Sequence, residues 1–231
     1  MNIKFTFLSL ILLTFAVNEI QAQNRTPYGD FPNVSVSATA GTQGIGADVK
    51  VNLSQPFGVR AGVSILPFNW QTVYTGRSEP TNLKLDADFA NAHLMFDWHP
   101  STDHDNILDK FILTVGGAYW WKDKGTAVIT YNGIYKYGDI EIPSDQLGEL
   151  QGKVQWNKVT PYIGVGLDDI FSARTFDFGF SIGTYYMGKP DASLTGTKLL
   201  AANTSNSEQF AKNLSYYRFL PVVQLNFNIH L

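Results

Sequence analysis

The sequence contains no cysteine, and after its first 22 residues it holds no apolar run long enough to form a membrane-spanning helix. Without cysteine the fold contains no disulfide bond, which excludes the small disulfide-stapled scaffolds found among exported proteins. A spanning helix needs about 20 consecutive, mostly apolar residues. The chain after residue 22 is therefore not predicted to cross a membrane as helices.

Positive charge is also scarce. Lys and Arg together number 17 against 20 Asp and Glu, which gives a formal net charge of −3, and no basic run stands out along the chain. Proteins that bind nucleic acid neutralise phosphates with clustered Lys and Arg. The charge balance therefore argues against nucleic acid as a partner.

Residues 1–22 have the three parts of a secretory signal peptide. The stretch MNIK carries a positive charge, FTFLSLILLTFAV is apolar, and NEIQA ends on a small residue. The apolar core is shorter than a membrane anchor requires. We therefore expect cleavage after Ala22, a short N-terminal segment at 23–32 and one domain at 33–231.

Apolar side chains occupy every second position in several later stretches, for example FGVRAGVSI (57–65), FDFGFSIGTYY (176–186) and the terminal FLPVVQLNFNIHL (219–231). A period of two predicts a β-strand with one apolar face. The opposite face is rich in Gly, Ser and Ala with occasional charges, which fits a crowded polar barrel interior. The apolar face would then contact lipid, and lipid requires the sheet to close on itself. An exported soluble β-sandwich is the alternative.

The pattern predicts an all-β fold, an eight-stranded antiparallel transmembrane β-barrel with up-and-down order and long surface loops. The predicted strands are 33–40, 44–53, 57–73, 82–99, 110–130, 153–168, 174–195 and 214–231. The parity of the apolar positions changes between Ala40 and Ile45, so 33–53 forms either two strands joined by a tight turn or one strand with a bulge. Barrels of this kind have an even strand count, which favours two. A similar change of parity at 90–91 predicts a bulge within the strand 82–99.

Four stretches carry a resemblance to a known family: GTQGIGADVKVNLSQPFGVRAG (41–62), FDWHP (96–100), TPYIGVGL (160–167) and the C-terminal strand. They resemble the small outer-membrane β-barrel proteins of Gram-negative bacteria, in the group that shares the transmembrane domain of outer membrane protein A. The resemblance covers nearly all of the chain after residue 22. It implies an outer-membrane location and a barrel fold, and it specifies no activity.

The resemblance also implies insertion by the barrel-assembly machinery, which recognises a C-terminal strand of alternating hydrophobic residues that usually ends on an aromatic residue. The matching positions here are Val223, Leu225, Phe227, Ile229 and Leu231. The last of these is aliphatic, which departs from the usual pattern.

Strand parity predicts that twelve ionisable residues point into the barrel: Asp48, Lys50, Arg60, Lys84, Asp86, Asp88, His93, Asp97, Lys122, Asp177, Arg218 and His230. One interpretation is a path for protons or ions, or a gate built from an ion pair that can switch. The other is a plugged barrel whose interior charges pair with each other, because unpaired charges away from water are costly. An eight-stranded barrel is only wide enough for side chains to fill it, which favours the plug.

No catalytic, cofactor or metal site is predicted. His99 and His104 lie beside acidic residues in a polar turn, but a metal site needs three or four convergent ligands. Ser64 is predicted to face a histidine on a neighbouring strand, yet nothing in the sequence marks it as an activated nucleophile. The protein is therefore not expected to be an enzyme.

The long loops are the remaining candidates for recognition. Tyr131, Tyr135 and Tyr137 lie among acidic residues in one of them, where tyrosines suit binding of a protein or a glycan. They equally suit a belt of aromatic residues at the level of the lipid headgroups.

These observations predict a monomeric outer-membrane β-barrel with a structural or surface-interaction role, such as membrane integrity, adhesion or service as an accessory subunit of an envelope complex. Its expected partners are outer-membrane lipid, the assembly machinery during insertion, and a protein or glycan at the loops. A narrow channel for small solutes is the first alternative, and a lipid-modifying enzyme is the second.

Overall fold

The computed structural model describes residues 32–54, 56–75, 80–101, 110–172 and 175–231, with only the backbone of Lys136, Tyr137 and Ser172. The chain divides into two units, 1–30 and 31–231. The predicted signal peptide and nearly all of the predicted N-terminal segment therefore lie outside the described residues. Among the described residues, no helix is long and apolar enough to span a membrane.

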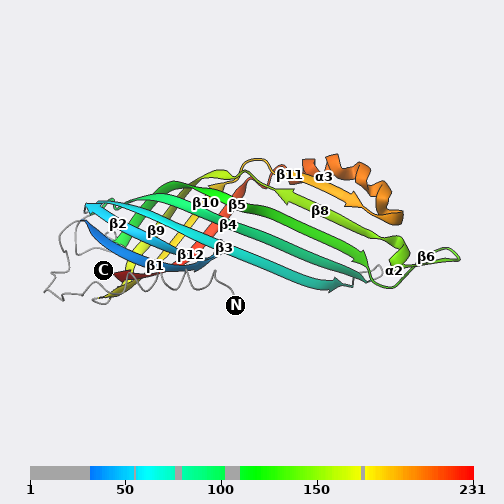
Figure 1. Ribbon diagram of the computed structural model, residues 1–231, viewed down its shortest axis with the longest axis horizontal. Coiled ribbons are helices and arrows are strands. Elements are labelled where there is room, and N and C mark those ends of the chain that lie inside the picture. The colour runs from blue at the N-terminus through cyan, green and yellow to red at the C-terminus, as the bar shows by residue number, and fades with distance from the viewer. Residues whose placement is uncertain (1–31, 55, 76–79, 102–109, 173–174) are drawn as a thin grey trace, which may run out of the picture. The chain divides into compact units, whose positions relative to one another are not determined.

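Eight antiparallel strands close into a barrel (Figure 1). They are β1 (Asn33–Gly41), β2 (Gly44–Ser54), β3 (Phe57–Tyr74), β4 (Thr81–Trp98), β5 (Phe111–Tyr131), β9 (Val159–Ser172), β10 (Phe176–Tyr186) and β12 (Phe219–His230). The pairing of β1 with β12 and of β5 with β9 completes the circle. The predicted eight-stranded barrel is thus confirmed, and 33–53 forms two strands, whose paired residues run to Gly41 and Gly44 on either side of a tight turn.

The C-terminal parts of β3 and β5 and the N-terminal part of β4, here called the upper parts of these strands, continue beyond the barrel. They form an open sheet with two further strands, β8 (Glu149–Gln155) and β11 (Asp191–Gly196). We call this sheet the extension (Figure 1). A separate hairpin is made by β6 (Ile134–Tyr137) and β7 (Ile140–Pro143). The helices are α2 (Ser144–Leu147), the 3₁₀ segment η2 (Lys198–Asn206) and α3 (Ser207–Leu214).

Three predicted strands differ from those observed. Two of them combine a barrel strand with a strand of the extension, and the third begins later than predicted. The predicted strand 153–168 contains the end of β8 and most of β9, and 174–195 contains β10 and most of β11. Gly188, with φ of +73°, and Pro190, which lacks an N–H group, separate β10 from β11. The predicted strand 214–231 begins at Phe219, because α3 extends to residue 214. The short strands alternate like the barrel strands, so periodicity alone does not reveal the breaks.

The irregularity predicted at 90–91 is present, but its extra residue lies in β5 and not within β4. The register between β3 and β4 runs without interruption from Phe57 opposite Trp98 to Tyr74 opposite Thr81. The irregularity lies in the pairing with β5, where Lys122 is opposite Ala90, Trp120 is opposite Asn91, and Trp121 is the extra residue. The same face of β4 therefore continues from the barrel into the extension.

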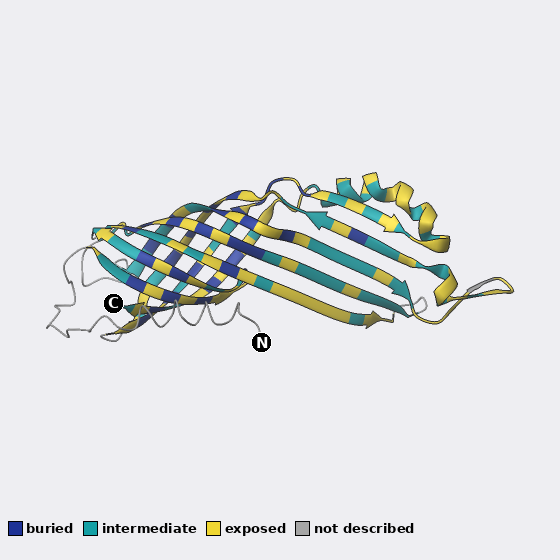
Figure 2. Ribbon diagram, in the orientation of Figure 1, coloured by how far each residue is buried: buried dark blue, intermediate teal, exposed yellow. Residues whose placement is uncertain are grey.

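The two faces of β3, β4 and β5 exchange polarity where the barrel ends. On β4 the outward residues are apolar up to Ala90 and then become Asp88, Asp86 and Lys84, whereas the inward residues change from polar to apolar at Phe89. On β3 the outward row beyond Ile65 becomes mixed, with Asn69 and Gln71 between Pro67 and Val73. Figure 2 shows the regular alternation of buried and exposed positions along the barrel strands and its loss in the extension.

The inward face of the extension is partly covered by helix. A Cβ on Gly152 of β8 would lie 2.9 Å from the ring of Phe210 of α3. The N–H of Leu194 in β11 donates to the hydroxyl of Ser207, the first residue of α3, at 2.9 Å. Amphipathic α3 thus packs its apolar side on β8 and β11.

The barrel interior as the candidate functional site

The centre of the barrel holds a buried network of charges. The Arg60 guanidinium lies 3.2 Å from the carboxylate of Asp97 and 4.0 Å from that of Asp48. His93 contacts the other oxygen of Asp48 at 3.0 Å, and the Thr114 hydroxyl donates to Asp97 at 2.7 Å. Because β2, β3, β4 and β5 are adjacent, inward residues at the same height meet across the strands. A buried cation flanked by two carboxylates ties four strands together.

A second pair lies nearer the end where the chain terminates. Lys50 of β2 forms an ion pair with Asp168 of β9, and His99, just after β4, lies 3.9 Å from the same carboxylate. Burial lowers the pKa of His99, and the neighbouring Lys50 ammonium lowers it further. His99 is therefore neutral at pH 7, and the formal ion pair here is the one between Lys50 and Asp168.

The last layer at this end is built on Asp177 of β10. His230 lies 2.6 Å from its carboxylate, and the Asn228 amide donates to it at 2.5 Å. Asp169, Asp177 and His230 have ligand atoms within 4.8 Å of one another and could together offer three ligands to a metal ion. Asp177 already has two polar partners and Asp169 is exposed, so pairing within the layer accounts for the arrangement.

The opposite end of the barrel is closed by aromatic rings. Trp120 meets Tyr185 edge-on with ring centroids 5.4 Å apart, and Tyr185 lies 4.8 Å from Tyr162. Phe89 packs edge-on against Trp120 at 5.9 Å, and the Trp120 indole donates to Thr160 at 2.8 Å. Trp120 and Tyr185 are fully buried. These bulky inward residues close the barrel below the extension.

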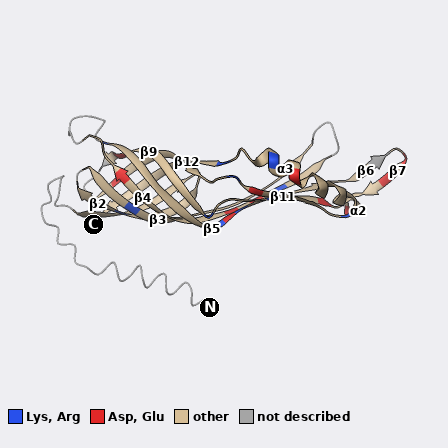
Figure 3. Ribbon diagram, turned by 90° about the horizontal axis from the view of Figure 1, so that it is seen from above, with Lys and Arg blue, Asp and Glu red and all other residues tan. Residues whose placement is uncertain are grey.

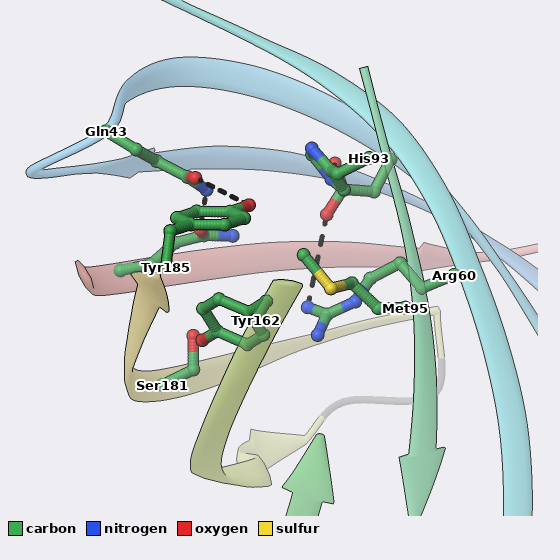
Figure 4. Close-up of a pocket in the computed structure, with 9 residues that line it drawn as sticks. Gln43, Arg60, His93, Met95, Tyr162, Ser181 and Tyr185 are labelled. Atoms are coloured by element: carbon green, nitrogen blue, oxygen red, sulfur yellow. Dashed lines mark hydrogen bonds and ion pairs between the residues drawn. The ribbon is translucent and has the colours of Figure 1, made fainter. Parts of the chain in front are cut away.

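Between the central charges and the aromatic rings lies a void of about 10 Å³ (Figure 4). Its lining includes Gln43, Arg60, His93 and Tyr185. The Tyr185 hydroxyl donates to the side-chain amide oxygen of Gln43 at 3.3 Å. A void of this volume holds about one water molecule. This void among the described residues is therefore too small for a larger solute.

Six of the twelve residues predicted to be interior charges lie buried or nearly so inside the barrel: Asp48, Lys50, Arg60, His93, Asp97 and Asp177. His230 lies half-buried at the mouth, paired with Asp177. Asp168, which forms the ion pair with Lys50, is not among the predicted interior charges, because it is the last residue of the predicted strand 153–168. The inward parity of Thr160 and Tyr162, two residues apart, could have shown that Asp168 also faces inward.

The remaining five lie elsewhere, and the prediction is wrong for them. Lys84, Asp86, Asp88 and Lys122 stand on the outward face of the extension, where Lys122 pairs with Asp88 at 3.0 Å and Lys84 with Asp86 at 3.4 Å. Arg218 is exposed just before β12. Lys84, Asp86 and Asp88 face outward because β4 keeps its register while its polar residues change face beyond Ala90. Lys122 faces outward because Trp121 is an extra residue in β5.

The C-terminal positions lie on β12, which closes the barrel between β1 and β10. Val223, Leu225 and Ile229 are exposed on the outer surface, and Leu231 follows the strand. Phe227 packs against Phe178 with ring centroids 5.0 Å apart. The alternating stripe therefore forms part of the outward apolar surface.

The candidate loop tyrosines lie at the far end of the extension. Tyr131 ends β5 and meets Tyr135 of the β6–β7 hairpin edge-on, with ring centroids 5.7 Å apart. Tyr137 lies in β6, and its side chain is outside the described part of the structure. His104 and its acidic neighbours also lie outside the described residues.

No catalytic arrangement is present among the described interior residues. Ser64 is buried and its hydroxyl has no hydrogen-bond partner there. The two ring nitrogens of His93 are occupied by Asn91 and Asp48, both at 3.0 Å. Nothing here activates the serine as a nucleophile.

An apolar outer face, a closed antiparallel barrel and a polar interior packed with side chains define the chain as a small transmembrane-type β-barrel. Two solved structures share this fold: CarO and CarO2 of Acinetobacter baumannii. Each is 19% identical in sequence to this chain and covers 88% of it and 100% of its own length, with TM-scores of 0.64 and 0.63. No family model and no curated protein matches the sequence. The likeness is therefore one of fold.

Proposed function

We propose that this protein is a monomeric outer-membrane β-barrel with a plugged interior, and that its role is structural or interactive and not the passage of solutes. The barrel would serve as a membrane-embedded base for the extension and the β6–β7 hairpin. The closed antiparallel barrel, a fold that this chain shares with the CarO structures, supports a location in a membrane. So does an outward face that is apolar along the barrel and becomes mostly polar beyond Ile65 and Ala90.

The observation that carries the proposal is the packing of the interior. Charged layers at Asp177, at Lys50 and at Arg60 succeed one another along the barrel, and the aromatic rings of Trp120 and Tyr185 follow. The void among them has room for about one water molecule. A solute would have to displace several buried ion pairs to pass, and separating such pairs is costly.

The proposal assigns the two ends of the barrel to the two sides of the membrane. The long connections from β5 to β9 and from β10 to β12 lie at the same end as the extension, and short periplasmic turns with longer external loops are the usual arrangement. The extension would then lie at the cell surface. Lipid would surround the outward apolar surface of the barrel, here called the apolar belt. The assembly machinery would contact the C-terminal strand during insertion.

The first experiment combines membrane fractionation with single-channel recording. We expect the full-length protein in the outer-membrane fraction, with a heat-dependent shift in gel mobility that reports a closed barrel. The refolded barrel should give no steady conductance in a planar bilayer. A reproducible conductance from heat-shiftable protein would contradict the plug and favour the narrow channel.

The surface-interaction role is tested by removing the hairpin alone. Deletion of Ile134–Pro143, bridged by two glycines, leaves β5 and β8 and all their pairings in place. Adhesion of cells to immobilised host protein or glycan should fall, while the heat shift is kept. The double variant Tyr131→Ala/Tyr135→Ala should have the same effect if the tyrosines make the contact. Unchanged adhesion in both would remove this role and leave the structural one.

A further inference from the structure

We propose that the outer face of the extension binds a saccharide that carries an anionic group. The site is a hollow of about 400 Å³ on β5, β8 and β11, which are neighbouring strands of the extension (Figure 1), and we call it the outer hollow. This inference adds a ligand site to the proposed surface role. It rests on the proposed function only for the position of the extension at the cell surface.

The strand register brings the polar residues of the outer hollow together. They form two rows across the three strands: Asp191, Gln155 and Lys124 in the row nearer the barrel, and Ser193, Lys153 and Thr126 in the next. Gly125, Val154 and Ala192 complete the lining and lie between the rows. Opposite residues in neighbouring strands lie about 5 Å apart, and rows on one face are separated by about 6.6 Å. The two rows therefore cover a patch roughly 10 Å by 7 Å, which suits a disaccharide.

The two rows lie on the outer face of the sheet. Lys124 is opposite Asp88 of β4, which belongs to the outward row. Gly152 faces the other side, because a Cβ there would lie 2.9 Å from the ring of Phe210 in α3. Successive residues of a strand point to opposite faces, so Lys153 points outward. The outer hollow therefore opens on the side away from α3.

The polar groups of the outer hollow are available to a ligand. Gln155 donates to Asp123 at 3.2 Å, whereas the other five polar side chains of the lining form no hydrogen bond or ion pair within the described part of the chain. Lysines elsewhere on the same face differ, since Lys122 pairs with an aspartate at 3.0 Å and Lys84 with another at 3.4 Å. Two ammonium groups and one carboxylate thus share the hollow without pairing with each other.

A saccharide with an anionic group matches these side chains. Hydroxyl groups both donate and accept hydrogen bonds, so those of a sugar suit the Asp191 carboxylate and the hydroxyls of Thr126 and Ser193. The ammonium groups of Lys124 and Lys153 suit a carboxylate or phosphate on the sugar, because hydrogen bonds between charged groups are the strong ones. The volume falls within the range of about 300–1,000 Å³ that is typical of small-molecule sites. A single inorganic ion would leave most of it unfilled.

The outer hollow lies just above the apolar belt. Its first row is level with Asp88, two residues beyond Ala90, the last apolar residue of the outward row on β4. At about 3.3 Å per residue, the two rows stand roughly 7 and 13 Å beyond the belt along the strand. Headgroups occupy a layer about 5–8 Å thick on each side of the bilayer. The hollow can therefore receive a sugar of a membrane glycolipid or a saccharide from outside the cell.

The test is a titration of the full-length protein in detergent, followed by saturation-transfer NMR. The probes are a panel of disaccharides that carry a carboxylate or a phosphate, the same disaccharides without that group, and inorganic phosphate. At least one anionic disaccharide should bind, and Lys124→Gln/Lys153→Gln should weaken its binding at least about tenfold. The matched control Lys158→Gln/Lys212→Gln removes the same charge outside the hollow and should leave binding unchanged. Purified lipopolysaccharide identifies the source: displacement of the disaccharide indicates a membrane glycolipid, and no displacement indicates a saccharide from outside.

Three results would overturn the inference. They are an anionic panel that binds no more tightly than its neutral counterparts, inorganic phosphate that binds as tightly as the best disaccharide, and equal loss of binding in the two double variants. The heat shift in gel mobility verifies that each variant is a closed barrel. Fractionation separates the two proposals: outer-membrane protein that binds no anionic disaccharide contradicts only the outer hollow, whereas a disaccharide-binding protein that is absent from the outer membrane contradicts only the proposed function.

Discussion

The lower and upper halves of β3, β4 and β5 use the same strands and the same register, yet their apolar side chains lie on opposite faces. Below Ile65 and Ala90 the outer face is apolar and the inner face holds the buried charges. Above those residues the outer face carries paired Lys and Asp, and the inner face carries Phe89 and its apolar neighbours. Figure 3 shows few charges on the barrel strands and more along the extension.

The apolar side chains change face because the surroundings of each face differ between the two halves. In the lower half we place lipid outside, where a charge is unfavourable, and a confined polar interior inside. In the upper half water would contact the outer face, and apolar residues instead gather on the inner side, partly under α3. Strand alternation thus indicates that the two faces differ, and only the surroundings decide which face is buried.

The largest expected effect comes from the central cation. Replacing Arg60 with Met leaves the carboxylates of Asp48 and Asp97 buried without their cation, so we expect a loss of about 3–5 kcal/mol in the free energy of unfolding. The matching change in the extension, Lys84→Met, leaves the partly exposed Asp86 with its Asn69 donor and should change stability by less than about 1 kcal/mol. Urea titration of both variants in lipid vesicles, followed by tryptophan fluorescence, measures the difference. Equal losses would show that the two halves do not differ in burial.

A charge placed on the outer face should separate the two halves by a slightly smaller amount. Leu94 lies on the outer face of β4 in the middle of the belt and is 60% exposed in the absence of lipid. Leu94→Arg should destabilise the folded barrel by about 2–4 kcal/mol in vesicles. Gln71→Arg, on the outer face of the extension, should stay within about 0.5 kcal/mol of the unaltered protein. If both variants behave alike, the apolar belt does not contact lipid.

The sequence was sufficient to predict the barrel, because alternation over nine or more residues is a local property of each strand. The strand count, the turn between β1 and β2 and six of the buried charges follow from that pattern. Their parity could be read directly because each lies on a strand whose outward residues are apolar throughout the belt.

The extension was not predicted, because its strands alternate with the same period and only their surroundings differ. The inversion on β4 has the same sequence pattern as a slipped strand, and that pattern predicts Lys84 and Asp88 inside the barrel. The extra residue lies one strand away, at Trp121, and shows only in the pairing with β5. The aromatic closure by Trp120 and Tyr185 was missed because it joins β5 to β10, and pairing across a closed barrel depends on its shear.

Glycine positions offer a more moderate contrast between the packed barrel and the open sheet. A Cβ on Gly183 in the barrel would lie 2.2 Å from the Tyr162 hydroxyl oxygen, whereas a Cβ on Gly125 in the extension would meet nothing nearer than Trp156 at 3.9 Å. Gly183→Ala should therefore lower the free energy of unfolding by about 1–3 kcal/mol. Gly125→Ala should be neutral or slightly stabilising. A neutral Gly183→Ala would show that Tyr162 has space to move, and that the interior is less full than the plug requires.

The smallest expected effect isolates one hydrogen bond beside the central void. Tyr185 is fully buried and donates to Gln43, so Tyr185→Phe removes that bond while keeping the ring contacts with Trp120 and Tyr162. We expect a loss of about 1 kcal/mol in the free energy of unfolding. Tyr74→Phe in the extension is the control, because the Tyr74 side chain is exposed and its hydroxyl can bond water in either state. The conductance of Tyr185→Phe should remain zero, since the aromatic ring and not its hydroxyl fills the barrel. A steady current in this variant would show instead that the polar contact to Gln43 holds the closure in place.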